Sequence, residues 1–167
     1  MTKFELDKKV IDCKSCNLCK LEVNDNSQYY KGYGKLLARQ VSDKPEIMII
    51  GLNPSHIRWQ GLIYHYGGGI TEHNEHDNNV GAKFLEIFKL FKVFDKCYVT
   101  NAVRCSTESN KIEFENLMSC FPNLIDELDY VKPKLIFATG TQVYNFLVDK
   151  GVNLQFNVER INHPNYY

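Results

Sequence analysis

The sequence has no long apolar run and no excess of charge of either sign, and its first residues do not resemble a secretory leader. A membrane-spanning helix needs roughly 18 or more consecutive apolar residues, and no stretch of this chain provides them. Residues 1–12 carry too many charges for a signal peptide. We therefore expect a soluble protein of the cytoplasm.

Charge is balanced in this chain, with 20 lysine and arginine residues against 20 aspartate and glutamate residues. This balance excludes the strongly basic surface that is the global signature of many nucleic-acid-binding proteins. Any contact with a nucleic acid must therefore be local.

Short apolar runs alternate with helical patterns along the chain. Four runs are typical of strands buried in a sheet, and they cover residues 46–51, 97–100, 134–139 and 152–158. Helical patterns cover residues 4–12, 81–94, 113–131 and 141–150, with an interruption at Pro122 and a stop at Gly151. The alternation predicts a single α/β domain over residues 1–167, with a central, mainly parallel, four-stranded sheet flanked by helices.

The residues that follow each predicted strand are the candidates for chemistry, because open parallel sheets bind ligands at the carboxyl ends of their strands. These candidates are residues 51–55, 101–105, Gly140 and 163–167. The polar stretch 21–45 is instead expected to be an extended connection with at most one weak strand.

Six cysteines in a chain without a secretion signal favour metal ligation or buried thiols over disulfides. Cys13 and Cys16 share one tight turn, which presents two thiolates to one metal centre. Cys105 and Cys120 flank a loop and the first turns of a predicted helix. These four residues can make a complete set of ligands.

An iron-sulfur cluster is one occupant that such a set of four thiolates could hold, and two other interpretations fit the same spacing. The four thiols could hold a structural zinc ion, or the cysteines could be buried simply as small apolar side chains. Cys97 lies within a predicted strand and is expected to belong to the core. Cys19 continues the spacing of the first pair and is either a substitute ligand or a thiol beside the site.

The order of short motifs along the chain resembles that of the iron-sulfur uracil-DNA glycosylases, the class often called family 4. The motifs are Cys-Lys-Ser-Cys at 13–16, Ile-Ile-Gly-Leu-Asn-Pro-Ser at 49–55, Tyr-Val-Thr-Asn-Ala-Val-Arg-Cys at 98–105, Cys-Phe-Pro at 120–122, Lys-Pro-Lys at 132–134 and His-Pro-Asn-Tyr at 163–166. Their order and spacing together are far more specific than any one of them.

The resemblance implies a role for several of these residues. Cys13, Cys16, Cys105 and Cys120 would hold a 4Fe-4S cluster. Asn101 would read the base, because a carboxamide can donate to one carbonyl of uracil and accept from its ring NH, a pattern that cytosine does not match.

The resemblance also implies that His163 is the catalytic histidine. A histidine near the leaving base can stabilise the uracil anion by hydrogen bonding as the glycosidic bond breaks.

The first motif departs from the family pattern. The family usually has Gly-Glu-x-Pro-Gly, whereas residues 51–55 of this chain are Gly-Leu-Asn-Pro-Ser, with Leu52 in place of the acid. This segment is similar to the Gly-Ile-Asn-Pro-Gly motif of the mismatch-specific uracil and thymine glycosylases, in which the asparagine positions the hydrolytic water. Asn53 would inherit that role, and because an amide orients water but takes no proton, slower catalysis is expected.

The remaining expected site residues surround the base and the DNA strand. Tyr64 is the candidate for stacking on a flipped base, and Gly51 is assigned to the same pocket. The residues expected to contact DNA are Pro54, Ser55, Arg58, Asn165 and Tyr166. His73 and His76 could bind a metal, but no third ligand is evident beside them.

The leading hypothesis is hydrolytic removal of uracil from uracil-containing DNA by a monomeric glycosylase. The enzyme is expected to be monofunctional, since no lysine occupies a recognisable nucleophile position. One alternative is a glycosylase for another mismatched or deaminated base, such as thymine or hypoxanthine. A second alternative is a non-catalytic iron-sulfur protein that binds DNA through the same pocket.

Overall fold

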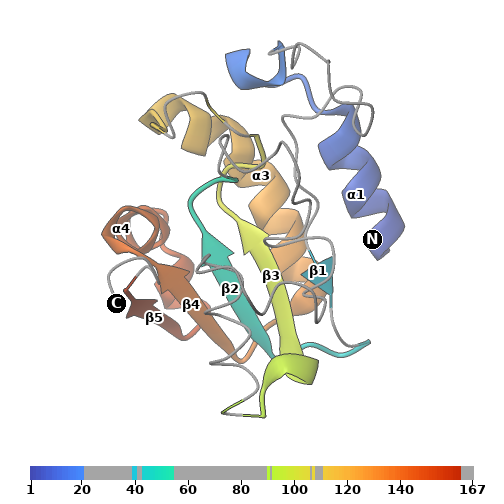
Figure 1. The fold of residues 1–167 in the computed structure, drawn as a ribbon, viewed down its shortest axis with the longest axis vertical. Helices are drawn as coiled ribbons and strands as arrows, with labels where there is room; N and C mark the ends of the chain where they lie inside the picture. Colours follow the sequence, from blue (N-terminus) through green and yellow to red (C-terminus); the bar gives the residue numbers. More distant parts are fainter. Residues whose placement is uncertain are drawn as a thin grey trace.

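The computed structural model describes residues 1–20, 39–40, 43–54, 90, 92–105, 107 and 111–162. Within these ranges, five strands form one sheet in the order β1-β3-β2-β4-β5 (Figure 1). The strands are β1 (Arg39–Gln40), β2 (Ile47–Gly51), β3 (Cys97–Asn101), β4 (Leu135–Thr139) and β5 (Val158–Ile161). Strands β2 to β5 are parallel to one another, which confirms the predicted α/β fold with a four-stranded parallel sheet.

The sheet differs from the prediction at the edge formed by its last strand. The last strand was predicted at 152–158, but Val152–Leu154 forms the short 3-10 helix η4, and β5 begins only at Val158. Gly151 takes a positive φ of 71°, and the amide of Leu154 donates to its carbonyl oxygen at 3.1 Å, so the chain turns where an extended strand was expected. At the opposite edge, the two-residue β1 pairs antiparallel with β3 and supplies the weak strand expected within 21–45.

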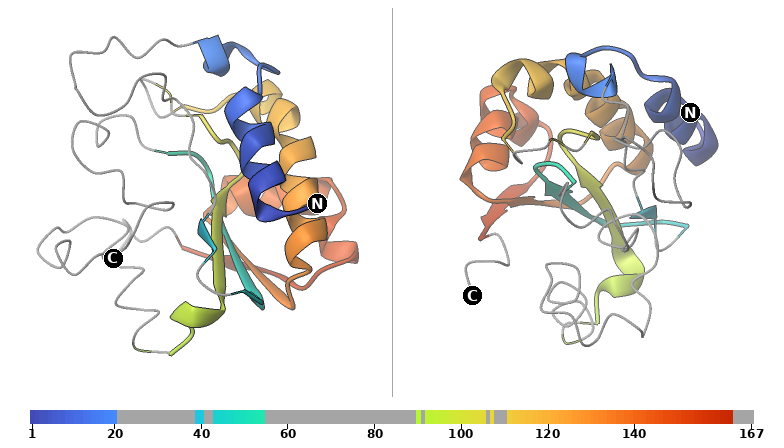
Figure 2. Two further views of the ribbon diagram at one scale, coloured as in Figure 1. Left: turned by 90° about the vertical axis from the view of Figure 1, so that its right-hand side faces the viewer. Right: turned by 45° about the horizontal axis from the view of Figure 1, so that its top comes forward.

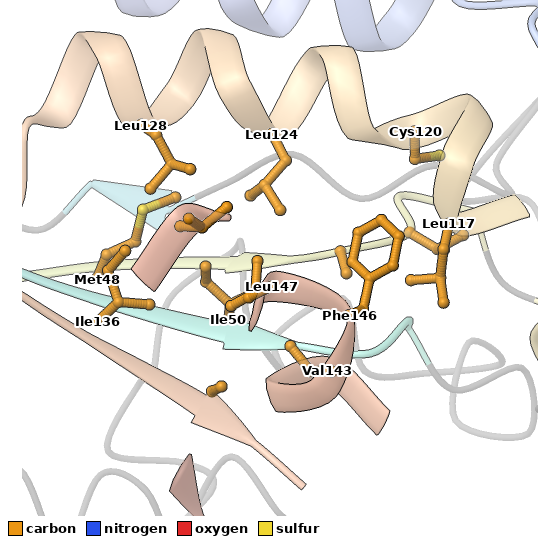
Figure 3. Packing of buried hydrophobic residues seen from close by; sticks show 14 of the residues in the cluster. Met48, Ile50, Leu117, Cys120, Leu124, Leu128, Ile136, Val143, Phe146 and Leu147 are labelled. Carbon is orange, nitrogen blue, oxygen red and sulfur yellow. The ribbon is translucent and has the colours of Figure 1, made fainter. Parts of the chain in front are cut away.

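Helices α1 (Lys3–Asp12), α3 (Phe114–Val131) and α4 (Thr141–Asp149) all lie on one side of the sheet (Figures 1 and 2). The main core lies between α3, α4 and the strands, and Figure 3 shows Leu124 and Leu128 of α3 facing the sheet near Ile50 of β2. Ile49 and Val99 point to the opposite face of the sheet, as the alternation of strand residues requires.

Helix α3 runs without a break through Pro122, which corrects the predicted interruption. Proline removes one helical hydrogen bond and usually bends or ends a helix. Here Pro122 is exposed, whereas Leu117, Cys120 and Leu124 are buried against the core on the other side of the helix (Figure 3). Packing of this apolar side offsets the lost bond.

Two of the three remaining helix predictions are confirmed. Helices α1 and α4 occupy the predicted ranges to within one residue at each end, and Gly151 follows α4 in the left-handed conformation that the predicted stop requires. The helix predicted at 81–94 lies mostly outside the described residues. In the described part of the chain, none of the helices has the length and apolarity needed to cross a bilayer.

Candidate functional site

Strands β2 and β3 end side by side, and the segments that follow them stay paired. Gly51 lies opposite Asn101 in the parallel register. Beyond the strand ends, the amide of Ala102 donates to the carbonyl oxygen of Gly51 at 2.7 Å, and the amide of Val103 donates to that of Leu52 at 2.8 Å. The first and second motifs are therefore held together at the carboxyl edge of the sheet.

The side chain of Asn101 is buried at this edge, with 1% of its surface exposed. Neither its Oδ1 nor its Nδ2 atom has a hydrogen-bond partner within the described part of the chain. A buried carboxamide without partners costs about 1–3 kcal/mol, so native proteins rarely keep one without a reason. One donor and one acceptor are thus available to a ligand from a fixed position.

Gly51 makes room for this carboxamide. A methyl group built on Gly51 would collide with Oδ1 of Asn101. Glycine is therefore required here because of the close approach of a side chain from the neighbouring strand, and not because of an unusual backbone conformation.

Asn53 lies at the same edge, two residues beyond β2, and is partly exposed. Its Nδ2 atom donates to the carbonyl oxygen of Pro54 at 3.0 Å, and Pro54 itself is buried. The Oδ1 atom remains the group with which Asn53 could hold a water molecule.

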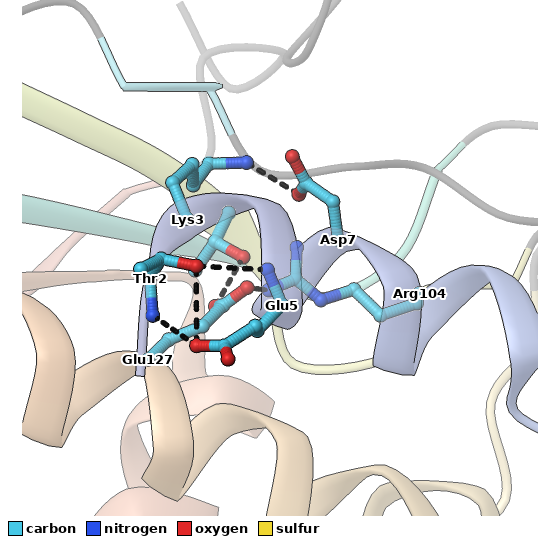
Figure 4. A network of polar contacts seen from close by, with 7 residues as sticks. Thr2, Lys3, Glu5, Asp7, Arg104 and Glu127 are labelled. Carbon is cyan, nitrogen blue, oxygen red and sulfur yellow. Dashed lines mark hydrogen bonds and ion pairs between the residues drawn. The ribbon is translucent and has the colours of Figure 1, made fainter.

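A buried ion pair lies behind this edge. The guanidinium of Arg104 contacts the carboxylate of Glu127 on α3, and each side chain is about as buried as Asn101 (Figure 4). The hydroxyl of Thr100 donates to the second oxygen of the Glu127 carboxylate at 2.9 Å. Burial raises the pKa of Glu127, and the charge of Arg104 opposes that shift.

No motif of the sequence points to Glu127, although its position on α3 is a signal. Glu127 is the one carboxylate on the buried side of α3, between Leu124 and Leu128. A charged residue at such a position needs a buried partner, so the motif arginine was the natural candidate. The pair ties α3 to the segment between Asn101 and Cys105.

Five thiols gather where the N-terminal segment meets α3 and the chain after β3. The sulfur of Cys19 lies 3.8 Å from the sulfurs of both Cys16 and Cys105. Cys120 is buried in the same core cluster as Cys105, and Cys16 and Cys19 pack against that cluster. The four predicted ligands and Cys19 thus come from three segments to one place, and none of the five is in a disulfide.

Cys13 lies nearer the surface than the buried thiols. The Nδ2 atom of Asn123 on α3 is 3.9 Å from its sulfur, and the hydroxyl of Ser15 is 3.5 Å away. Burial alone would raise the pKa of Cys13, but its hydrogen bonds with Ser15, Cys19 and Asn123 together outweigh burial and lower the pKa. Cys13 therefore becomes a thiolate more readily than Cys19, Cys105 or Cys120, whose pKa values are raised.

Cys19, Cys105 and Cys120 favour the protonated form. Burial raises the pKa of Cys120 to about 11, and burial together with the neighbouring thiols raises the pKa of Cys105 further and that of Cys19 in the same direction. A bound cation reverses this preference, because thiolates are the metal-binding form and binding releases their protons.

The donor set fits a thiolate centre in number and kind. A 4Fe-4S cluster or a structural zinc ion takes four such ligands. Among the residues that the structure describes, no group of three or more cysteine, histidine, aspartate or glutamate side chains has the arrangement of a formed metal site. The thiols are therefore gathered, but they are not in the geometry of a loaded centre.

Cys97 is separate from this group, as predicted for a core residue. It is fully buried in β3, on the sheet face that carries Ile49 and Val99. Its thiol donates to the carbonyl oxygen of Val93 at 3.1 Å, and burial raises its pKa to about 12.

Several predicted site residues lie outside the described residues, so their positions carry no argument. They are Ser55, Arg58, Tyr64, His73, His76, His163, Asn165 and Tyr166.

Comparison with known proteins gives two findings. The model of the uracil DNA glycosylase superfamily matches residues 38–167, which is most of the chain. The chain is also 25% identical over 152 residues to the type-4 uracil-DNA glycosylase of Sulfurisphaera tokodaii, in an alignment that covers 87% of this chain and 58% of that protein. The chain thus spans little more than half the length of this relative.

Proposed function

The chain belongs to the uracil DNA glycosylase superfamily, and from that premise we propose that it removes uracil from DNA by hydrolysing the N-glycosidic bond. The order of motifs in the sequence resembles that of the type-4 enzymes, and both comparisons agree with this resemblance. The observation that carries the choice of base is the buried carboxamide of Asn101 beside Gly51, which has no hydrogen-bond partner among the described residues. Such a group offers one donor and one acceptor, which uracil matches through a carbonyl and its ring NH.

The base has to leave the duplex stack before Asn101 can read it. Tyr64 would stack on the flipped base, and Ser55, Arg58, Asn165 and Tyr166 would hold the strand around it. Pro54 was expected to contact DNA as well; because it is buried, it would fix the course of the loop instead of touching a phosphate. The partner in this proposal is uracil-containing DNA, bound by one copy of the chain.

The hydrolytic step would be shared between Asn53 and His163. The carboxamide of Asn53 would orient water towards the sugar carbon as positive charge develops there. His163 would donate a hydrogen bond to the departing uracil anion.

Cys13, Cys16, Cys105 and Cys120 would hold a 4Fe-4S cluster, with zinc as the alternative occupant. A bound cluster would link the N-terminal segment, the chain after β3 and α3, and so stabilise the fold around the base pocket. Every reacting group named above is a protein side chain, so this proposal gives the cluster a structural role.

The test of the hydrolytic roles is a comparison of Asn53→Ala and His163→Ala with the wild type on a single-stranded oligonucleotide that contains one uracil. One orienting hydrogen bond contributes about 1 kcal/mol, so we expect Asn53→Ala to slow excision by roughly fivefold. His163→Ala should slow excision at least as much. Strand breakage after alkali treatment measures the abasic product.

Asn145→Ala is the matched control, because Asn145 is an exposed asparagine on α4. It should leave excision unchanged. Unchanged excision in both Asn53→Ala and His163→Ala would remove these residues from the proposed mechanism. Wild-type protein that binds the oligonucleotide without cleaving the glycosidic bond would favour the non-catalytic alternative.

A further inference from the structure

The group of sulfur atoms contains one thiol more than a four-ligand centre uses. Cys19 lies at 3.8 Å from two of the four expected ligands, Cys16 and Cys105. The sulfur of Cys13 lies beside Ser15 and Asn123, and a hydrogen bond with Cys19 contributes to its lowered pKa. Cys19 is therefore positioned at least as centrally among the sulfurs as Cys13 is.

The local backbone gives Cys16 and Cys19 the geometry of a ligand pair. They are separated by two residues, as Cys13 and Cys16 are, and the amide of Cys19 donates to the carbonyl oxygen of Cys16 at 3.3 Å. This turn closes the loop between them, so both sulfurs face the same side. Two thiolates on one turn are the usual way in which a chain presents a metal-binding pair.

The turn that carries Cys19 is anchored to the rest of the protein at two points. Leu18 is buried in the main core. The Nδ2 atom of Asn116 on α3 donates to Oδ1 of Asn17 at 3.0 Å. The position of Cys19 beside Cys105 is thus fixed by contacts that do not involve any thiol.

We propose that Cys19 is a fifth metal-binding cysteine of this centre, able to take the ligand position of Cys13. The centre then has two alternative N-terminal ligand pairs, Cys13 with Cys16 and Cys16 with Cys19, while Cys105 and Cys120 serve in both. This inference rests on the proposed thiolate centre and adds an exchangeable ligand to it. Its consequence is that the loss of Cys13 is tolerated, whereas the loss of both Cys13 and Cys19 is not.

The test measures metal retention in Cys13→Ala, in Cys19→Ala and in the double variant. Each protein is purified anaerobically, loaded either with ferrous iron and sulfide or with zinc chloride, desalted and analysed for metal per chain. Both single variants should keep at least half of the wild-type metal. The double variant should lose metal affinity by at least about tenfold, since even the removal of a group that only supports a ligand costs 10- to 100-fold. Cys97→Ala controls for the loss of a thiol outside the group and should retain metal fully.

A second measurement needs no variant. Loaded wild-type protein is treated with iodoacetamide, and the modified cysteines are identified by mass spectrometry. Because only one of the two alternative thiols is bound at a time, chains modified at Cys13 and chains modified at Cys19 should both occur, and chains modified at both should be rare. Loaded Cys13→Ala should be protected at Cys19.

Three results overturn the proposal. The first is that Cys13→Ala, folded by circular dichroism, loses as much metal as the double variant. The second is that Cys19 alone is alkylated in loaded wild type while Cys13 is always protected. The third is a wild type that retains neither iron nor zinc, and this result would also remove the thiolate centre from the proposed function. Uracil excision by that same preparation would show that the glycosylase proposal holds without the thiolate centre.

Discussion

Replacing Glu127 with alanine should lower the free energy of unfolding by about 3–5 kcal/mol, the usual cost of breaking a buried ion pair by removing one partner. The variant leaves the guanidinium of Arg104 buried with no carboxylate beside it. It also removes the acceptor of the Thr100 hydroxyl. The midpoint of urea denaturation should fall with little change in slope.

Two further variants identify the cause of this loss. Asp129→Ala removes an exposed carboxylate two residues along α3 and should leave the midpoint nearly unchanged. The double variant Arg104→Met/Glu127→Leu removes both charges and should recover most of the stability, because well-packed apolar residues commonly replace a buried pair without net cost. A small effect of Glu127→Ala, or no recovery in the double variant, would contradict the account of this pair.

Replacing Asn101 with alanine should reduce kcat/KM for uracil excision by about 100- to 1000-fold, the range seen when one preorganised donor is removed from an active site. The effect is large because the carboxamide is held in place before the base arrives, buried and without protein partners in the described part of the chain. Single-turnover excision of uracil from single-stranded DNA is the measurement. Asn145→Ala again serves as the control for an asparagine lost elsewhere.

The variant Gly51→Ala tests the same group from the neighbouring strand. Its added methyl group would collide with Oδ1 of Asn101 and displace the carboxamide, so the loss of excision should approach that of Asn101→Ala. Because both changes act on one side chain, the double variant should be no slower than Asn101→Ala alone. Additive losses would mean that Gly51 acts independently of Asn101, and full activity of Gly51→Ala would mean that the carboxamide does not read the base.

The centre of the sheet was predictable because β2 and β3 are buried on both faces. The continuous apolar run Ile47–Gly51 is typical of a buried parallel strand, and β2, β3 and β4 appear within one residue of their predicted ends. The apolar run after Gly151 was wrongly predicted to be a strand, for a specific reason. Val152 is apolar because it packs into the core from a 3-10 turn, and burial of a short segment leaves the same pattern whether or not the segment is extended.

The candidate site was predictable only where it lies in recognisable motifs. Asn101 and the cysteines follow from motif order, but the free space that Gly51 leaves for Asn101 depends on the register of two strands far apart in the sequence. The Arg104 to Glu127 pair and the contact of Cys19 with Cys105 are likewise long-range contacts. A single sequence shows the residue types in such pairs but not which residue meets which.

The most direct test of the proposed function is the identity of the base that the protein releases. Anaerobically purified wild-type protein is incubated with single-stranded and mismatched oligonucleotides that each contain one uracil, hypoxanthine or mismatched thymine, and the free bases are identified by mass spectrometry. Our account predicts free uracil from both uracil substrates and strongly reduced release by Asn101→Ala. Release of hypoxanthine or thymine with no release of uracil, or release of no base at all, would contradict it.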